Sequence, residues 1–149
     1  MVIKLIELRV FELKDMETVQ RWFNDFEIQR RLGGMVPLNE WYNYIHNNEH
    51  YFVWLALENK QPVGMIMVET EDDFIGSVAL VVKPSLRNKG YGRLIIEKTM
   101  LLPEMSVIKK WFAGIEADNF ACIKCFQSIG YKLENTQPDE DGYYSLIHL

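Results

Sequence analysis

The chain has 149 residues, of which 48% are hydrophobic and 13% aromatic, so we expect a single domain, residues 1–149, that can bury a full core. Its net charge of −5 argues against nucleic acid as a partner. The presence of only two cysteines, the early charges Lys4, Glu7 and Arg9, and the lack of an apolar run of about 20 residues predict a cytoplasmic protein without a signal peptide or membrane span.

The chain begins with an alternating segment that predicts a half-buried strand, in which Ile6, Leu8 and Val10 face one side. Two amphipathic helices follow, the first starting at Asp15 as N-cap and the second following Pro37. We interpret their apolar stripes mainly as core, with the wall of a ligand site as the alternative. The stripes comprise Met16, Val19, Trp22, Phe23 and Phe26 in the first helix and Leu38, Trp41, Tyr42 and Ile45 in the second.

The rest of the chain predicts six strands and two helices. The expected strands are Tyr51 to Leu57, Val63 to Thr70, Val78 to Val82, Trp111 to Ala117, Tyr131 to Glu134 and Tyr143 to Leu149, and the expected helices are Leu94 to Leu102 and Ala121 to Ile129. This order predicts an α/β (α+β) fold with one mixed sheet and helices on its faces.

The segment from Val78 to Met100 concentrates positive charge. Five Lys and Arg residues stand against one acid between Lys83 and Lys98, whereas the rest of the chain has 11 against 20. Gly90 and Gly92 would let an anion approach the N–H groups at the start of a helix. The pattern predicts a phosphate-binding loop, and the alternative is a basic turn in which the glycines serve geometry only. The P-loop and dinucleotide patterns are both absent from the sequence.

Two spaced motifs resemble the signatures of the GCN5-related N-acetyltransferase (GNAT) family. Arg87-Asn88-Lys89-Gly90-Tyr91-Gly92 resembles the acetyl-coenzyme A signature [QR]-x-x-G-x-[GA]. Asn119 to Tyr131 resembles the second signature, N-x-x-A-x-x-x-Y-x-x-x-G-[FY], with Phe126 at its tyrosine position. The opening, with Trp22-Phe23-Asn24-Asp25 and Leu32-Gly33-Gly34, is similar to the branch of ribosomal-protein and aminoglycoside acetyltransferases. The resemblance implies a GNAT-like acyl-CoA N-acyltransferase fold with a mostly antiparallel sheet.

The resemblance also implies where acetyl-CoA binds. The pantetheine arm would lie along the strand 80–82, where the sheet splays from the strand that begins at Trp111. The pyrophosphate would lie on the amides of residues 88–93, and Asn119 would contact the pantetheine, cap a helix, or do both. The implied cofactor-binding residues are Leu80, Val81, Val82, Arg87, Asn88, Lys89, Gly90, Tyr91, Gly92, Arg93 and Asn119.

Three positions that carry catalysis in the family hold other residues here. Ser77 and Gly114 stand where relatives place glutamates, and Phe126 stands where a tyrosine protonates the leaving thiolate. The backbone amide of Val81 or Val82 remains as an oxyanion donor. The substitutes are Glu69, Glu71, Glu116 and Asp118 as bases, with solvated surface carboxylates as the alternative, and one of Tyr143 and Tyr144 as acid.

Two further patterns resemble metal-binding motifs, but neither predicts a metal site. His46-Asn47-Asn48-Glu49-His50 spells the inverted zinc-protease motif, but it lies at the end of a short expected helix. Cys122 and Cys125 form C-x-x-C without a second pair, and their spacing fits one packed helix face.

The sequence therefore predicts an acetyl-CoA-dependent N-acetyltransferase, in which a primary amine attacks the thioester directly. The acceptor would be a small-molecule amine or a protein N-terminus, and the protein a monomer or homodimer. A non-catalytic acyl-CoA sensor is the alternative, because three catalytic positions are vacant. A scaffold without a cofactor would leave the basic loop unexplained.

Overall fold

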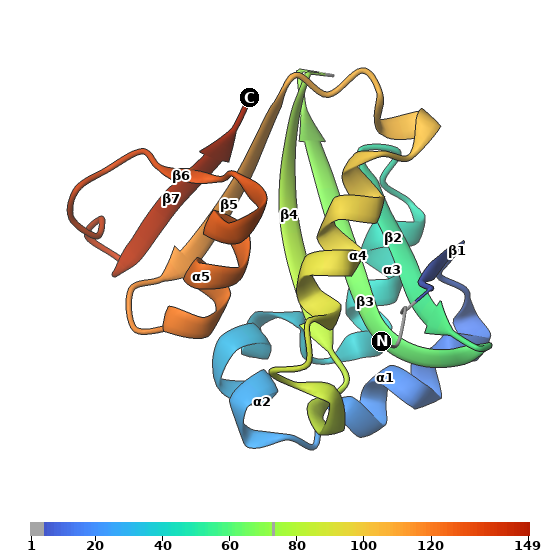
Figure 1. The fold of residues 1–149 in the computed structure, drawn as a ribbon. Helices are drawn as coiled ribbons and strands as arrows, with labels where there is room; N and C mark the ends of the chain where they lie inside the picture. The colour runs from blue at the N-terminus through green and yellow to red at the C-terminus, as the bar shows by residue number, and fades with distance from the viewer. Residues whose placement is uncertain (1–4, 73) are drawn as a thin grey trace.

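The computed structural model describes residues 5–72 and 74–149, which form one mixed sheet with helices on both faces (Figure 1). Its seven strands run in the order β1-β2-β3-β4-β5-β7-β6, and neighbours are antiparallel except for β4 and β5. This architecture confirms the predicted fold class. The strands are β1 (Glu7–Val10), β2 (Tyr51–Glu58), β3 (Gln61–Glu71), β4 (Ile75–Val82), β5 (Lys110–Glu116), β6 (Lys132–Leu133) and β7 (Tyr143–His148), and the helices are α1 (Met16–Trp22), α2 (Phe26–Leu32), α3 (Leu38–His46), α4 (Tyr91–Met100) and α5 (Phe120–Ile129).

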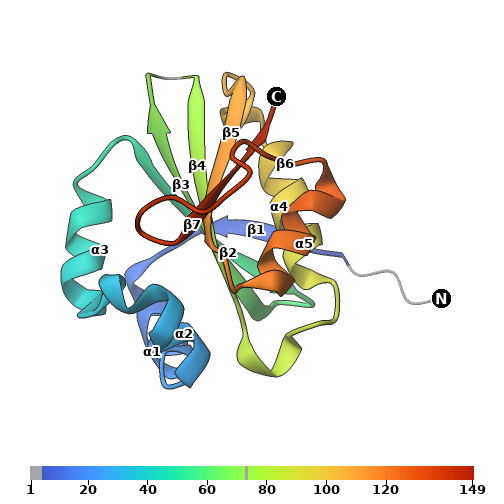
Figure 2. The same cartoon turned by 90° about the vertical axis from the view of Figure 1, so that its left-hand side faces the viewer.

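Different helices cover the two faces of the sheet, as Figure 2 shows: α1, α2 and α3 lie on one side, and α4 and α5 on the other. Successive side chains of a strand point to opposite faces. Met65 and Met67 of β3 therefore pack in the core beneath α1 to α3, whereas Ile66 and Val68 pack in the core beneath α4. The central strands are buried on both sides, which explains their continuous apolar sequences.

Strands β4 and β5 are paired only near their beginnings. The partners are Ile75 with Lys110, Gly76 with Trp111 and Ser77 with Phe112. Beyond these pairs the two strands diverge (Figure 1), while β4 stays paired with β3 up to Val82. The edge of β4 over residues 78–82 therefore faces an opening rather than a strand, which is the splay expected from the resemblance.

The first predicted helix is in fact two helices. α1 ends at Trp22, and Asp25 starts α2 by accepting a hydrogen bond from the N–H of Ile28 at 3.1 Å. The break changes the helical phase, so Phe26 is 77% exposed instead of lying in the core. The prediction of Phe26 as a core residue is therefore wrong.

The N-terminal segment differs from the prediction at two positions. Val10 is 63% exposed, because β1 is an edge strand and the buried positions go to Ile6 and Phe11. Asp15 occupies the predicted N-cap position of α1, but its side chain makes no capping bond to the helix. Its buried carboxylate instead accepts hydrogen bonds from the guanidinium of Arg9 at 2.8 and 3.1 Å.

Candidate active site

A cavity of about 840 Å³ lies where β4 and β5 diverge, and it has two arms on opposite faces of the sheet. We call the first the α4 arm. The α4 arm is lined by Leu80, Val82, Leu86, Arg87, Asn88, Gly90, Tyr91, Gly92, Arg93, Asn119, Cys122, Cys125 and Phe126. We call the second the α2 arm, and it is lined by Glu27, Ile28, Arg31, Leu32, Ala79, Gly114, Glu116, Asp118 and Tyr143.

The α4 arm contains the N-terminus of α4. The N-cap is Gly90, at φ 86°, which provides no side-chain hydrogen bond for the first amides of the helix. A Cβ atom at Gly92 would lie only 3.3 Å from both Cys125 Sγ and Leu80 Cδ2. Helix N–H groups without a side-chain cap, beside a position with little room for a side chain, make a close approach site for a phosphate. The residues here therefore fit the phosphate end of coenzyme A.

Three of the predicted cofactor residues do not direct their side chains into the cavity. The Val81 side chain is 2% exposed in the core beneath α1 to α3. The Tyr91 side chain is buried, and its hydroxyl donates to Glu58 at 2.5 Å. Lys89 is not among the residues that line the cavity. Leu80 and Val82, in contrast, pack on the α4 side of the sheet and line the cavity with their side chains.

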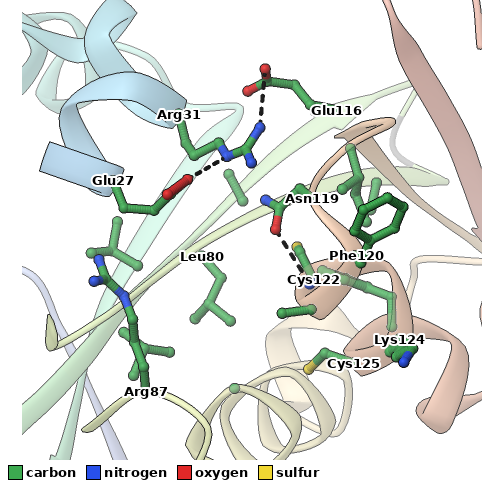
Figure 3. A pocket seen from close by; sticks show the side chains of 18 of the residues that line it. Glu27, Arg31, Leu80, Arg87, Glu116, Asn119, Phe120, Cys122, Lys124 and Cys125 are labelled. Atoms are coloured by element: carbon green, nitrogen blue, oxygen red, sulfur yellow. Dashed lines mark hydrogen bonds and ion pairs between the residues drawn. The ribbon is translucent and has the colours of Figure 1, made fainter. Parts of the chain in front are cut away.

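Two polar side chains of the α4 arm, Arg87 and Asn119, have partners within the protein. The Arg87 guanidinium forms a bidentate ion pair with Asp25, with an Nη1 to Oδ1 distance of 3.2 Å. Asn119 Oδ1 accepts from the N–H of Cys122 at 3.4 Å, so Asn119 is the N-cap of α5. Figure 3 shows the Asn119 amide nitrogen on the side away from α5, toward Arg31. The capping role is thus confirmed, and the nitrogen remains available for a cofactor contact.

The α2 arm is organised around Arg31, which the sequence did not single out. Its side chain is 14% exposed and donates to Asp118 at 2.6 Å. It also donates to Glu27 at 2.9 Å and lies 3.2 Å from Glu116, and Figure 3 draws these two pairs. Burial lowers the pKa of the guanidinium, but the hydrogen bonds to Asp118 and Glu27 outweigh it, so the pKa is raised. The only feature of the sequence that could have pointed to Arg31 is its i, i+4 spacing from Glu27, on the helix face that carries Ile28.

A family model described as the acetyltransferase (GNAT) family matches residues 16–131. The chain belongs to this family. It is 38% identical over 141 residues, 93% of each chain, to a protein of Bacillus subtilis described as the uncharacterized N-acetyltransferase YfmK. Family membership confirms an acetyl-CoA-dependent N-acetyltransferase, as the two motifs predict.

Solved structures of GNAT proteins share the fold. Spermidine N-acetyltransferase from Vibrio cholerae, in complex with CoA and spermine, superposes with a TM-score of 0.81 at 14% identity, covering 97% of this chain and 95% of that one. The Campylobacter jejuni N-acetyltransferase PseH, in complex with acetyl coenzyme A, gives a TM-score of 0.74 at 15% identity, covering 97% and 98%. The aminoglycoside acetyltransferase AAC(6')-Ib, in complex with coenzyme A, gives 0.81 at 18% identity, covering 97% and 94%.

Among the base candidates of this GNAT chain, only two carboxylates line the cavity. Glu116 and Asp118 belong to the α2 arm, whereas Glu69 and Glu71 are exposed on β3 outside it. The hydrogen bond from Arg31 is the main cause that lowers the pKa of Asp118. A carboxylate with a lowered pKa is a weak proton acceptor, so Asp118 is poorly suited to act as the base.

The two tyrosine candidates lie on opposite faces of β7. Tyr143 is the cross-strand partner of Glu116 and lines the α2 arm. Tyr144 is the partner of Ile115 and packs against the core beneath α4 and α5. Of the two tyrosines, Tyr143 is therefore the one that faces the cavity.

The three vacant positions have distinct surroundings. Ser77 lies in the paired part of β4, below the opening. Gly114 lines the α2 arm, and a Cβ there would meet only the Phe112 ring, at 3.7 Å. Phe126 is 2% exposed, and its ring packs edge-on against Tyr131 with centroids 4.8 Å apart. Gly114 and Phe126 carry no proton-transfer group, and the Ser77 hydroxyl does not line the cavity.

The two cysteines share one face of α5, as their spacing indicates, and line the cavity. Burial raises the pKa of the Cys122 thiol to about 12 and also raises that of Cys125. Both are therefore thiols at neutral pH. In residues 5–72 and 74–149 no group of three or more His, Cys, Asp or Glu side chains is arranged to hold a metal ion, and no helix is long and apolar enough to cross a membrane.

Proposed function

We propose that the chain transfers the acetyl group of acetyl-CoA to a primary amine that enters through the α2 arm. The observation that carries this proposal is the course of the cavity, which runs through the splayed sheet from an anion-binding helix terminus to a carboxylate-lined wall. Two substrates can therefore approach from opposite faces and meet beside the open edge of β4. Transfer without release of either substrate requires such a meeting point.

Residues of the α4 arm would hold the coenzyme. The uncapped amides that follow Gly90 and the guanidinium of Arg87 would bind phosphate, and the backbone edge of residues 80–82 would pair with the pantetheine amides. When bound, acetyl-CoA supplies the acetyl group as a thioester. Backbone N–H groups of Val81 or Val82 would stabilise the negative charge that develops on the carbonyl oxygen.

The charges of the α2 arm suit a protonated amine. Three carboxylates, Glu27, Glu116 and Asp118, share two guanidinium groups, those of Arg30 and Arg31. One negative charge is therefore in excess, and an incoming ammonium group would balance it.

Glu116 is the carboxylate best placed to take the proton of that ammonium. Asp118 pairs with both Arg30 and Arg31, whereas Glu116 pairs with Arg31 alone, through Oε2 at 3.2 Å. Arg31 contacts a single oxygen of Glu116, so the carboxylate can accept a second hydrogen bond from an incoming donor. Tyr143, across the strand pair, would return a proton to the leaving thiolate.

Direct attack by the amine is favoured over an acetylated enzyme. The cysteines nearest to the α4 arm have raised pKa values and stay protonated, so neither is an active nucleophile. The attacking group must then come from the acceptor. Small-molecule amines are the preferred acceptors, because structural neighbours are named as acetyltransferases of spermidine and aminoglycosides.

Calorimetry with coenzyme A, followed by an assay of thiol release from acetyl-CoA, tests the proposal. The acceptor panel would contain spermidine, kanamycin and a short peptide with a free N-terminus. We expect micromolar to millimolar binding of the cofactor, as is usual for enzyme substrates, and turnover with at least one amine. Cofactor binding without turnover across the panel would favour the non-catalytic sensor.

A further inference from the structure

Arg87, a cation of the cavity wall shortly before α4, is held by the N-cap residue of another helix. Asp25, which precedes α2, binds the guanidinium through both oxygens, with Nη1 to Oδ1 at 3.2 Å and a second bond from Nη2 to Oδ2. The two side chains are only 36% and 25% exposed. The same Asp25 carboxylate also caps α2 through the N–H of Ile28 at 3.1 Å.

A bidentate carboxylate occupies the Nη1–Nη2 edge of the guanidinium. Nη1 and Nη2 form a planar fork that matches two oxygens of a carboxylate or of a phosphate, but not of both at once. The hydrogen bond from Arg87 is the main cause that lowers the pKa of Asp25, so the carboxylate is charged throughout the neutral range. An anion that arrives at α4 must therefore displace Asp25 to use this edge.

We propose that Asp25 competes with the phosphates of coenzyme A for Arg87, and so limits the affinity of the enzyme for its cofactor. The proposal rests on the assignment of Arg87 to the cofactor phosphates in the proposed function. In the empty enzyme Arg87 pairs with Asp25; in the loaded enzyme it pairs with phosphate, and Asp25 keeps only its bond to α2. When the product coenzyme A leaves, Asp25 recaptures the guanidinium, which favours release.

Removal of the Asp25 charge tests the competition, because the cap can be preserved. Asparagine and serine are as good N-caps as aspartate, so D25N and D25S should keep α2 while weakening the hold on Arg87. We expect each variant to bind coenzyme A roughly threefold to tenfold more tightly than wild type in calorimetry, mostly through slower dissociation. Thermal denaturation would verify that each variant folds.

Two controls separate competition from the general effect of one fewer negative charge. E27Q removes a carboxylate from the same helix, but Glu27 pairs with Arg30 and Arg31 rather than Arg87, so the affinity should change less than about twofold. In an R87Q background, D25N should have no effect, because the contested group is gone.

Four results would overturn the inference. Weaker binding in both D25N and D25S would mean that Asp25 positions Arg87 for the phosphate instead of competing for it. An equal gain in coenzyme A affinity in E27Q would mean that the loss of any nearby negative charge explains the effect. A gain from D25N that persists in the R87Q background would mean the same. Failure of wild type to bind coenzyme A would refute the proposed function itself, and the competition with it.

Discussion

The guanidinium of Arg31 lies 3.2 Å from the carboxylate of Glu116, and this pair joins α2 to β5 across the splay of the sheet. The same guanidinium donates to Asp118 at 2.6 Å, directly after β5. The α2 arm is thus closed on one side by ion pairs rather than by apolar packing. Under the proposed function, an acceptor amine that enters there would meet Glu116 with its carboxylate already oriented by a partner.

The first prediction concerns Glu116. E116Q keeps the shape of the side chain but removes its capacity to accept a proton, so we expect kcat/KM for the amine to fall by roughly 10²–10⁴-fold. The affinity for coenzyme A should be unchanged, because Glu116 lies on the α2 arm. The matched control is E69Q, since Glu69 is an exposed glutamate outside the cavity. Equal losses in both variants, or full activity in E116Q, would exclude Glu116 as the base.

The second prediction concerns Gly92. An aspartate there would press its Cβ against Cys125 Sγ and Leu80 Cδ2, each at 3.3 Å, and would place a negative charge at the start of α4. We expect G92D to abolish the binding of coenzyme A in calorimetry. G34D is the control, because no atom lies within 4 Å of a Cβ at Gly34. Cofactor binding that survives in G92D would refute the placement of the phosphates.

Much of the fold could be predicted because its strongest signals are local. The apolar run of β4, the glycines that start α4 and Asn119 before α5 each act within a few residues, and the structure places all three as expected. The break between α1 and α2 was missed because Phe26 continues the apolar spacing of α1. The break is set by Asp25, which is the N-cap of α2, and the spacing of apolar residues carries no information about N-caps.

The candidate site was only partly predictable, since its polar contacts join distant segments. Arg31 meets Asp118 across 87 residues, and Arg87 meets Asp25 across 62. Such pairs follow from the fold and leave no pattern in the sequence. Glu69 and Glu116 could not be ranked for the same reason, because the choice depends on which strand end faces the cavity.

The third prediction concerns stability, away from the cavity. Burial raises the pKa of Asp15, but the hydrogen bonds from Arg9 and from the N–H of Glu12 outweigh it, so the pKa is lowered from 3.8. A folded-state pKa below the unfolded one stabilises the protein above pH 3.8, and this contribution is lost as the pH falls through the folded pKa.

We therefore expect D15N to lower the free energy of unfolding at pH 7 by about 1–3 kcal/mol, with a smaller difference from wild type at about pH 3. Urea denaturation at both pH values measures this. E17Q should change stability by less than about 0.5 kcal/mol, because Glu17 is 84% exposed and 3.9 Å from Arg21. A D15N effect as small as that of E17Q would show that the Arg9 pair contributes nothing.

The last prediction follows from Phe126, which has no proton for the departing thiolate. A thiol with a pKa of about 8.5 is a tolerable leaving group near neutral pH, so the reaction can proceed without an acid at this position. The fraction of unprotonated amine should then limit the rate, and activity should rise with pH toward the pKa of the acceptor. A rate that falls steadily from about pH 6 to pH 9 would contradict this account.

The substitution F126Y tests whether a hydroxyl at this position speeds the departure of the thiolate. Phe126 lines the cavity, so F126Y adds a proton donor there and should raise kcat, by at most the 10²–10⁴-fold typical of a positioned acid. F74Y is the control, because Phe74 is 57% exposed and does not line the cavity. Tyr143 is the proposed acid of the wild type, so Y143F should lower kcat, and the added hydroxyl of F126Y should recover part of that loss. Loss of kcat in F126Y with intact cofactor binding would instead mean that the α4 arm requires an apolar ring beside Tyr131.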